Sequence, residues 1–307
     1  PNIDKLAGRL NGRIPSGGSG KGGLDISRND LSEIISRGSN AMVDLGFAYS
    51  EDLENIESNG VLETDEGVSE RAMARGMKAL GTLGSGNHFL ELQTVQSIED
   101  ENPHNLFEGQ VVCMIHSGSR GLGHQVCTDH VRTLEDKYRN RGGTWHNDDW
   151  GFEIQDRQLA AAPIHSKEGQ EYLDAMNGAA NFAFANRSAL THRLRQTLAA
   201  EFEVETKLLY DVSHNIAKIE DHIIDGRKCT CAVHRKGATR TLPGQPVLVP
   251  GDMGTGSWLL EGKPGNRAFS SSCHGAGRLL SRSQAKKQID GKAIKKELES
   301  RGIRVHA

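Results

Sequence analysis

Glycine-bounded polar clusters, each at or near the end of a predicted strand, constrain this chain more than any other feature. The clearest four are Gly84–Leu92, Ile115–Gln125, Asp211–Lys218 and Ser271–Arg282. The 307 residues contain 36 glycines but only three tryptophans, four tyrosines and eight phenylalanines. Because glycine permits tight turns and close approach of the backbone to a ligand, this distribution favours a fold whose loops build a binding site.

Helical and strand-like segments are interspersed along the chain, which predicts an α+β (mixed α/β) fold in a single domain. No internal repeat and no linker interrupts the pattern, and 307 residues suffice for one large domain or two small ones. The expected helices cover residues 29–46, 67–80, 122–139, 156–198 (with a break at Ala162-Pro163) and 284–300. The expected strands are 111–115, 207–212, 229–234 and 246–250, with a loop over 10–23 and an acidic loop or short helix over 51–66.

Charge and cysteine content exclude some classes of protein. A net charge of −3 argues against a chain that is basic all over, so contact with nucleic acid needs a local patch. No run of about 18 apolar residues is present, so we expect no membrane span. Five irregularly spaced cysteines predict reduced thiols and a cytoplasmic protein, with Cys229 and Cys231 in a structural role.

Three histidines lie in similar glycine-flanked settings near predicted strand ends: His88, His116 and His214. Neutral imidazole is the commonest protein ligand for borderline divalent metals. Each histidine alone is better explained as a hydrogen-bonded structural residue. The recurrence of the setting favours a shared metal site, although spacing along the chain does not show that the three converge.

Basic residues accompany several of these loops. Arg120 lies in one, and Arg235, Lys236 and Arg240 surround a glycine turn. Bare amides and guanidinium groups suit phosphate, while a solvated turn is the alternative interpretation. No Walker A motif is present, and Gly18–Gly23 follows no predicted strand. His274, which stands before Gly275-Ala-Gly277 with Arg278 and Arg282 behind it, is similarly predicted to face an anion.

Polar residues also interrupt the Ala-rich helical region. Asn177, Asn181 and Arg187 would either face a groove or be satisfied inside the protein, and we expect the buried, hydrogen-bonded arrangement.

Taken together, the clusters resemble the RtcB family of RNA ligases. The similarity rests on Gly81–Glu91, His116–Gly121, Tyr172–Arg187, Asp211–Lys218, His234–Arg240, Pro250–Gly256 and His274–Arg278, which occur in the family's order. The resemblance implies a single RtcB-like domain with glycine-rich loops gathered at a central metal and nucleotide cleft. It implies a GTP- and Mn-dependent ligase that joins RNA 3′-phosphate or 2′,3′-cyclic phosphate ends to 5′-hydroxyl ends, as in tRNA splicing and RNA repair.

The resemblance also assigns residues. His274 would be the nucleophile that takes GMP from GTP, and two manganese ions would be held by His88, His116 and His214. Side chains that hold the guanylate, phosphates or RNA backbone would be Asn87, Glu91, Asn215, Ser257, Arg120, Lys236 and Arg278. An archease-type activator is a further partner that the family suggests.

One family motif is missing. The Asp-x-x-Cys-Gly segment, whose cysteine bridges the two metals in the family, does not occur in residues 1–307, and the family's C-terminal lysine segment is absent too. We therefore expect residues 1–307 to be an incomplete catalytic domain with impaired activity. The alternatives are a metal-dependent phosphoesterase, which would release phosphate without GTP, and a non-catalytic module that binds RNA ends.

Overall fold

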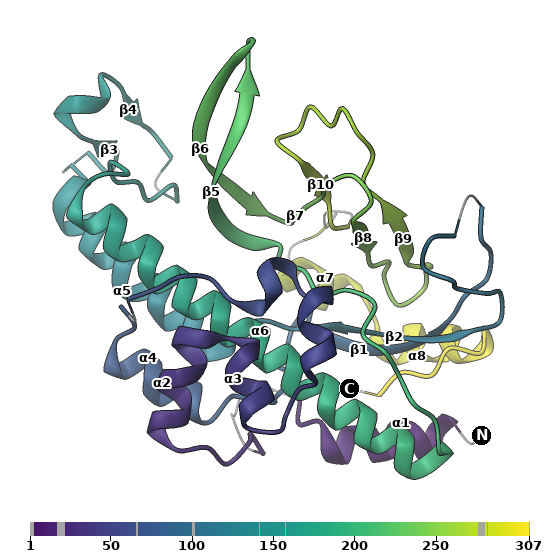
Figure 1. Cartoon of the computed structure of the whole chain (residues 1–307). Coiled ribbons are helices and arrows are strands. Elements are labelled where there is room, and N and C mark those ends of the chain that lie inside the picture. Colours follow the sequence, from purple (N-terminus) through teal and green to yellow (C-terminus); the bar gives the residue numbers. More distant parts are fainter. Residues whose placement is uncertain are drawn as a thin grey trace. The chain divides into compact units, whose positions relative to one another are not determined.

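The computed structural model describes residues 3–16, 22–65, 67–99, 102–140, 142–156, 158–275, 280 and 282–306 (Figure 1). The chain divides into two compact units, Leu10–Asp211 and Pro1–Arg9 with Val212–Ala307. Helices and small antiparallel sheets occur in the described residues, which confirms the α+β class. Helix α1 (Ile3–Arg13) runs across the first boundary in the sequence. No helix among these residues has both the length and the hydropathy needed to cross a membrane.

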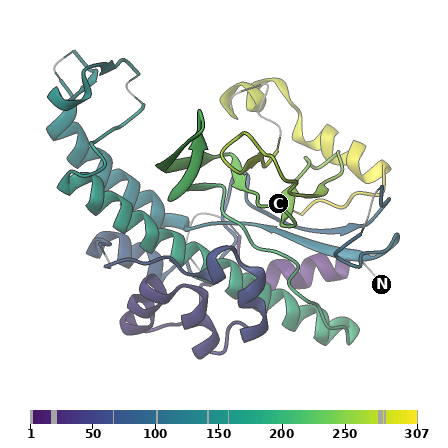
Figure 2. The same ribbon diagram turned by 45° about the horizontal axis from the view of Figure 1, so that its top comes forward.

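The larger unit is organised around α6, the 36-residue helix Lys167–Phe202. Ser166 caps its start by accepting a hydrogen bond from the Gly169 N–H, and Glu203 ends it in a left-handed conformation. Helices α2 (Arg28–Arg37), α3 (Ser39–Asp44) and α5 (Arg120–Tyr138) pack on α6, while α4 (Glu70–Met77) packs on α5, as Figures 1 and 2 show. The 3₁₀ turns η1 (Ser50–Asn55) and η2 (Glu57–Gly60) follow α3.

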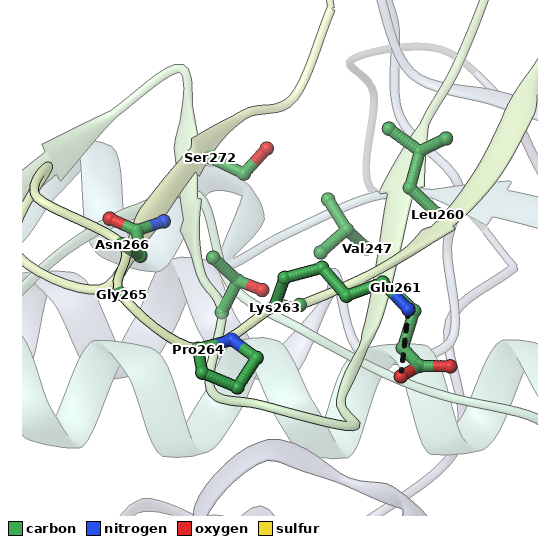
Figure 3. A pocket seen from close by; sticks show the side chains of 10 residues that line it. Val247, Leu260, Glu261, Lys263, Pro264, Gly265, Asn266 and Ser272 are labelled. Carbon is green, nitrogen blue, oxygen red and sulfur yellow. Dashed lines mark ion pairs between the residues drawn. The ribbon is translucent and has the colours of Figure 1, made fainter.

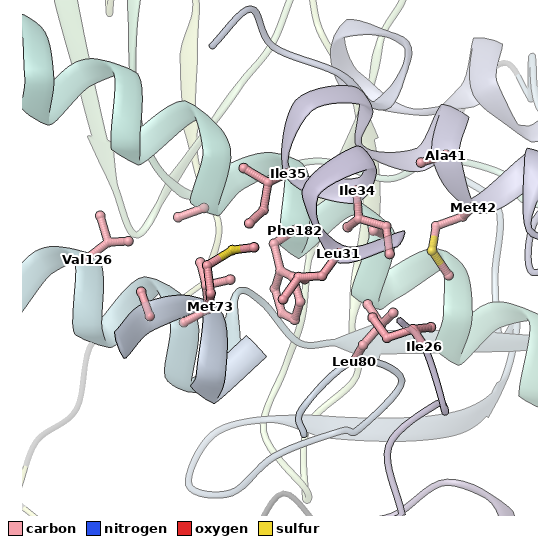
Figure 4. Packing of buried hydrophobic residues seen from close by; sticks show 14 of the residues in the cluster. Ile26, Leu31, Ile34, Ile35, Ala41, Met42, Met73, Leu80, Val126 and Phe182 are labelled. Carbon is pink, nitrogen blue, oxygen red and sulfur yellow. The ribbon is translucent and has the colours of Figure 1, made fainter. Parts of the chain in front are cut away.

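The main hydrophobic core lies where these helices meet (Figure 4). Leu31 and Ile34 of α2, Leu122 of α5 and Phe182 of α6 are completely buried. Alanine and glycine on α6 let neighbouring segments approach closely, and a Cβ at Gly178 would lie 3.0 Å from the side chains of Ile35 on α2 and Val68. Removal of a core phenylalanine side chain typically costs about 3–5 kcal/mol, so this cluster supplies much of the unit's stability.

A smaller core forms at the far end of α5. Trp145 in β3 (Trp145–His146) is fully buried beside Leu134 and Tyr138, and β3 pairs with β4 (Glu153–Ile154) around the turn η3 (Asp148–Trp150). The Tyr138 hydroxyl donates to Glu168 at 2.9 Å, and the Lys137 ammonium lies 2.5 Å from the same carboxylate. These contacts tie α5 to the first turn of α6.

The Glu168 contacts give a pH-dependent contribution to stability. Hydrogen bonds from Lys137, the backbone and Tyr138 lower the pKa of Glu168 from 4.5 to about 2. The stabilisation is therefore fully present above pH 4.5 and is lost as the pH falls from 4.5 towards 2. We expect Glu168→Gln to lower the urea midpoint at pH 7, with the difference from the parent shrinking steadily as titrations are repeated down to pH 3. Glu171→Gln, which removes an exposed partner of Lys167, should change the midpoint little at either pH.

Among its described residues, the smaller unit contains three antiparallel strand pairs and two short helices, together with the first part of α1. Strands β5 (Asn215–Ile224) and β6 (Arg227–Lys236) form a hairpin closed by Asp225-Gly226, whose positive φ values of 49° and 76° are those of a type I′ turn. The remaining pairs are β7 (Ala238–Arg240) with β10 (Ser271–Cys273) and β8 (Pro246–Val249) with β9 (Trp258–Glu261). Helices α7 (Arg282–Gln288) and α8 (Gly291–Ser300) follow.

Several expected elements differ from the structure. The helix expected over 29–46 is two helices, because Gly38 adopts φ 53° and ψ −129° between α2 and α3. Residues 207–212 are not a strand; only Asp211 forms a bridge, to Ile56. The long helix begins at Lys167 rather than residue 156, the C-terminal helix is interrupted before Asp290, and α1 continues to Arg13 within the expected loop. The expected strands at 111–115, 229–234 and 246–250 are confirmed to within a few residues.

Candidate functional site

In the larger unit, a two-stranded hairpin carries two of the predicted histidines. Strand β1 (Phe89–Thr94) pairs with β2 (Val111–His116) so that Phe89 lies opposite His116. The ring of His88, just before β1, lies 5.9 Å from the ring of His116 between centroids. The Phe89 ring packs edge-on against His116 at 5.2 Å. The hairpin register therefore places two half-buried imidazoles next to each other.

Arg120 lies against this histidine pair at the start of α5. Its Nη1 is 3.2 Å from His88 Nδ1, and its Nε donates to Thr82 Oγ1 at 3.3 Å. Burial lowers the pKa of Arg120, but a guanidinium still only donates hydrogen bonds. His88 Nδ1 must then accept, and the proton of a neutral ring sits on Nε2. Binding of a metal by His88 would require this contact with Arg120 to rearrange.

Helix α6 holds the loops on either side of these histidines. Asn186 is fully buried; its Oδ1 accepts from the Gly81 N–H at 2.7 Å. Its Nδ2 lies 3.2 Å from Thr82 O, Ser117 Oγ and Gly118 O. One amide side chain therefore connects the segment before His88 to the turn that follows His116.

Removal of this amide should destabilise the unit substantially. Each buried polar group left without a partner costs about 1–3 kcal/mol, so we expect Asn186→Ala to lose about 3 kcal/mol or more of unfolding free energy. The matched control is Asn177→Ala on the same helix, because Asn177 makes one bond, to Glu63 O, in an exposed setting. Urea titrations of the two variants should differ clearly; equal losses would show that Asn186 does not connect the loops energetically.

Asn181 and Arg187, two other polar residues of α6, are also held by internal hydrogen bonds, although Arg187 Nη2 is buried without a hydrogen-bond partner among the described residues. Asn181 donates to Ile35 O and Leu62 O and accepts from the Leu62 N–H. Arg187 donates to Asp211 Oδ1 at 2.7 Å and to Ser117 O at 3.3 Å. The sequence analysis singled out Asn181 and Arg187 but not Asn186. Asn186 carries the same signal as Asn181, because it is a polar residue inside an apolar stretch of helix.

The remaining predicted residues of this unit are more accessible. Asn87 is exposed in the turn before β1. Glu91 is half-buried on β1, where its carboxylate accepts a hydrogen bond from Gln93 Nε2 at 2.6 Å. Because Glu91 lies two residues after Phe89, it shares the sheet face of Phe89 and His116.

In the smaller unit, His214 and His274 lie in direct contact although 60 residues separate them in the sequence. Their ring centroids are 4.0 Å apart with planes tilted by 37°. Gly237 connects their backbones: its N–H donates to His214 O at 2.9 Å, and its carbonyl accepts from the His274 N–H at 3.3 Å. The positive φ of Gly237, 67°, gives the chain the bend that this double contact needs.

The surroundings of His274 favour the neutral form of its imidazole. Burial lowers its pKa below 6.5; the hydrogen bond with Gly237 acts in the opposite direction, and the charge of Lys236 adds to the lowering. Lys236 lies opposite Asn215 in the hairpin and donates to Asn215 Oδ1 at 2.9 Å. A neutral imidazole beside an ammonium group has both a nucleophilic nitrogen and a nearby positive charge for an anion.

Ser257 and Arg278 are the remaining predicted residues of this unit. Ser257 Oγ accepts from the Gly251 N–H at 3.1 Å and so closes the loop 251–257. Arg301, which follows α8, donates to Gly254 O in the same loop. Arg278 lies outside the described residues.

Arg235 does not present its charge to a ligand, contrary to the interpretation of its loop as a phosphate site. Its side chain is 1% exposed and forms an ion pair with Glu220. All five cysteines are free thiols, as expected, and the Cys231 thiol donates to the carbonyl of Cys229 at 3.7 Å.

A pocket of about 300 Å³ lies in the smaller unit between the β8–β9 pair and β10 (Figure 3). Val247 and Leu260 supply apolar surface, while Glu261 and Lys263 face each other at 3.8 Å. Ser272 of β10, two residues before His274, also lines it. None of the site residues predicted from the sequence lines this pocket.

Comparison with known proteins identifies the family. The family model described as "tRNA-splicing ligase RtcB" matches residues 1–307. The chain belongs to the RtcB family of RNA ligases. An RtcB named "tRNA-splicing ligase RtcB" from Thermococcus kodakarensis is 44% identical over 332 aligned positions, which cover 100% of this chain and 67% of the relative. An "RNA-splicing ligase RtcB" from Mycobacterium tuberculosis is 46% identical over 322 positions, covering 99% of this chain and 72% of the relative.

Other RtcB relatives are much longer. The chain covers 33% of the "tRNA-splicing ligase RtcB" of Pyrococcus furiosus, to which it is 44% identical over 333 positions. The RtcB match confirms the resemblance inferred from the glycine-rich clusters. Membership of this family also implies the use of a metal, and pairs of imidazole side chains are suitable metal ligands.

Proposed function

We propose that the chain is the catalytic body of a GTP- and Mn-dependent RNA ligase acting on 3′-phosphate or 2′,3′-cyclic phosphate ends and 5′-hydroxyl ends. The observation that carries the proposal is the contact between His274 and His214 beside Lys236, in a chain of the RtcB family. Lowering of the His274 pKa keeps its nitrogen lone pair available at neutral pH, which is what a histidine nucleophile requires.

The chemistry assigned to His274 is nucleotidyl transfer. A ring nitrogen attacks the α-phosphorus of GTP, an N–P bond forms, and the bond to the β-phosphate oxygen breaks with release of pyrophosphate. The GMP then passes to the RNA 3′-phosphate, and the 5′-hydroxyl attacks that activated phosphate and expels GMP. Lys236 and Arg120 would lie near phosphate oxygens, and so would Arg278, which is not among the described residues. Asn87, Glu91, Asn215 and Ser257 would hold the guanylate.

A divalent metal would neutralise phosphate charge in this reaction. The residues fit such an ion chemically, because each unit offers a close imidazole pair that includes proposed ligands: His88 with His116, and His214 with His274. His88, His116 and His214 are the proposed ligands. No cysteine of residues 1–307 stands in an Asp-x-x-Cys-Gly motif. We therefore expect residues 1–307 to bind manganese weakly and to join RNA ends slowly. An archease-type activator would act on the same transfer of GMP and joining of RNA ends.

The test is incubation with manganese and α-labelled GTP, followed by isolation of protein-bound label that is acid-labile and alkali-stable. Label is expected on the parent and on His165→Ala, an exposed histidine before α6, and not on His274→Ala. Equal label on His274→Ala would overturn the proposal. A parallel assay with 3′-phosphorylated RNA and no GTP distinguishes the alternatives: phosphate release would indicate a phosphoesterase, and RNA binding without either reaction would indicate a binding module.

A further inference from the structure

The buried guanidinium of Arg235 is held in place by Glu220. Nη1 and Nη2 of Arg235 lie 2.6 and 2.8 Å from the two carboxylate oxygens of Glu220. The same carboxylate lies 3.0 Å from His222 Nε2. Burial acts to raise the pKa of Glu220, but hydrogen bonds from Arg235 and His222 leave it below its usual value. The pair is therefore charged and fixed within the β5–β6 hairpin.

The other edge of the guanidinium supports a strained turn. Arg235 Nη2 donates to Phe269 O and Nε donates to Ser271 Oγ, both at 2.9 Å. Phe269 and Ser270 adopt φ values of 52° and 49°, two consecutive left-handed residues that are not glycine. Such a backbone persists only where its surroundings fix it, and the hydrogen bond to the Phe269 carbonyl provides part of that fixation.

This turn leads directly to His274. Strand β10 begins at Ser271, and Cys273 pairs with Ala238, so His274 is the next residue after the strand. On the other side, Arg235 is two residues before Gly237, which is hydrogen-bonded to the backbones of both His214 and His274. Arg235 therefore connects the two segments that determine where His274 lies. Its side chain holds the turn before β10, and its own strand leads into Gly237.

We infer that Arg235 is a positioning residue: it sets the placement of the His274 ring against His214 and does not bind substrate. The inference rests on the proposed function for its catalytic consequence, although the geometry itself can be measured without activity. Arg235→Lys is the sharpest variant, because a lysine keeps the charge beside Glu220 but cannot reach Glu220, Ser271 and Phe269 together.

The first measurement is independent of activity. In protein labelled with ¹⁵N-histidine, the His214 and His274 resonances are assigned with His274→Ala, and the contact between the rings is followed by cross-ring NOEs. We expect Arg235→Lys to weaken those NOEs and shift both resonances, whereas Lys236→Ala should leave the NOEs intact. Unchanged spectra in Arg235→Lys would overturn the inference even if the chain never reacts with GTP.

The second measurement separates positioning from substrate binding. Misplacement of a reacting group by about 1 Å costs about 100-fold in rate. We expect the maximal rate of labelling by GTP to fall by about that factor in Arg235→Lys, with the GTP concentration for half-maximal rate within about threefold of the parent. A weaker GTP affinity at an unchanged maximal rate would place Arg235 on the substrate instead.

A milder variant keeps the inference testable if Arg235→Lys does not fold. Ser271→Ala removes only the contact with Arg235 Nε and the bond from Ser271 to Phe269 O. It should shift the His274 resonance and slow labelling several-fold, in the same direction as Arg235→Lys. A Ser271→Ala protein with parental spectra and rate would count against the inference.

Discussion

Gly84→Ala is expected to reduce labelling by GTP about 100-fold while the protein stays folded. Gly84 precedes β1 with φ +109°, and a Cβ there would overlap Arg120 Nη1 and His88 Nδ1. Both obstacles are the ends of side chains, so they would move aside rather than unfold the unit. The displacement would move His88, a proposed metal ligand, and Arg120, a proposed phosphate contact, out of their places. A shift of about 1 Å in such a group costs about 100-fold in rate.

The matched control is Gly109→Ala in the connection between β1 and β2. Gly109 has φ +84°, but a Cβ there meets no atom within 4 Å. It reproduces the backbone strain without the overlap. Labelling rates and urea midpoints are measured for both variants. Equal loss of labelling in both would assign the effect to strain in the hairpin. Full labelling by Gly84→Ala would show that the placement of His88 and Arg120 does not matter to the reaction.

Gly38→Ala is expected to destabilise the larger unit by about 3–5 kcal/mol. Gly38 ends α2 by donating to Ile34 O at 2.8 Å and adopts φ 53°, which disfavours any residue with a Cβ. The added Cβ would also overlap the carbonyl oxygen of Gly60, a backbone atom that cannot rotate away. Strain and overpacking each cost about 1–3 kcal/mol, a large part of a typical stability of about 5–15 kcal/mol.

Gly46→Ala separates the two contributions. Gly46 has φ +76° after α3, but no atom lies within 4 Å of its hypothetical Cβ. Its expected loss is only the left-handed penalty of about 1–2 kcal/mol. The comparison needs unfolding free energies from urea titrations with equal slopes. If both variants lose the same amount, close packing of Gly38 against Gly60 does not matter to stability.

Elements that depend on local chemistry were predictable from the sequence. The strand at Val111–Ile115 and the helix that begins near Arg120 follow from apolar runs and periodicity. Asp225-Gly226 is a standard hairpin signal and would have located β5, which was missed. The break at Gly38 was missed because the apolar periodicity continues through it, and a positive φ leaves no trace in the pattern.

The candidate site was predictable only as a set of residue types. Glycine-flanked histidines and the family resemblance pointed to His214 and His274, but their ring contact depends on the pairing of β7 with β10. The sequence places Arg235 with Lys236 and Arg240 around a glycine turn, which suits either phosphate or solvent. The burial of Arg235 depends on the ion pair with Glu220 across the hairpin, which the sequence spacing does not reveal.

The amide side chains of α6 also restrict how the chain length can vary. Asn181 holds the segment at Leu62, and Asn186 holds the loops at Gly81 and Gly118, five residues further along the same helix. One inserted residue between them would rotate one amide by about 100° relative to the other and move it by about 1.5 Å along the axis. Insertions and deletions are therefore tolerable in the surface connections but not within this stretch of α6. The number of residues between the two amides fixes where the loops around His88 and His116 attach to the helix.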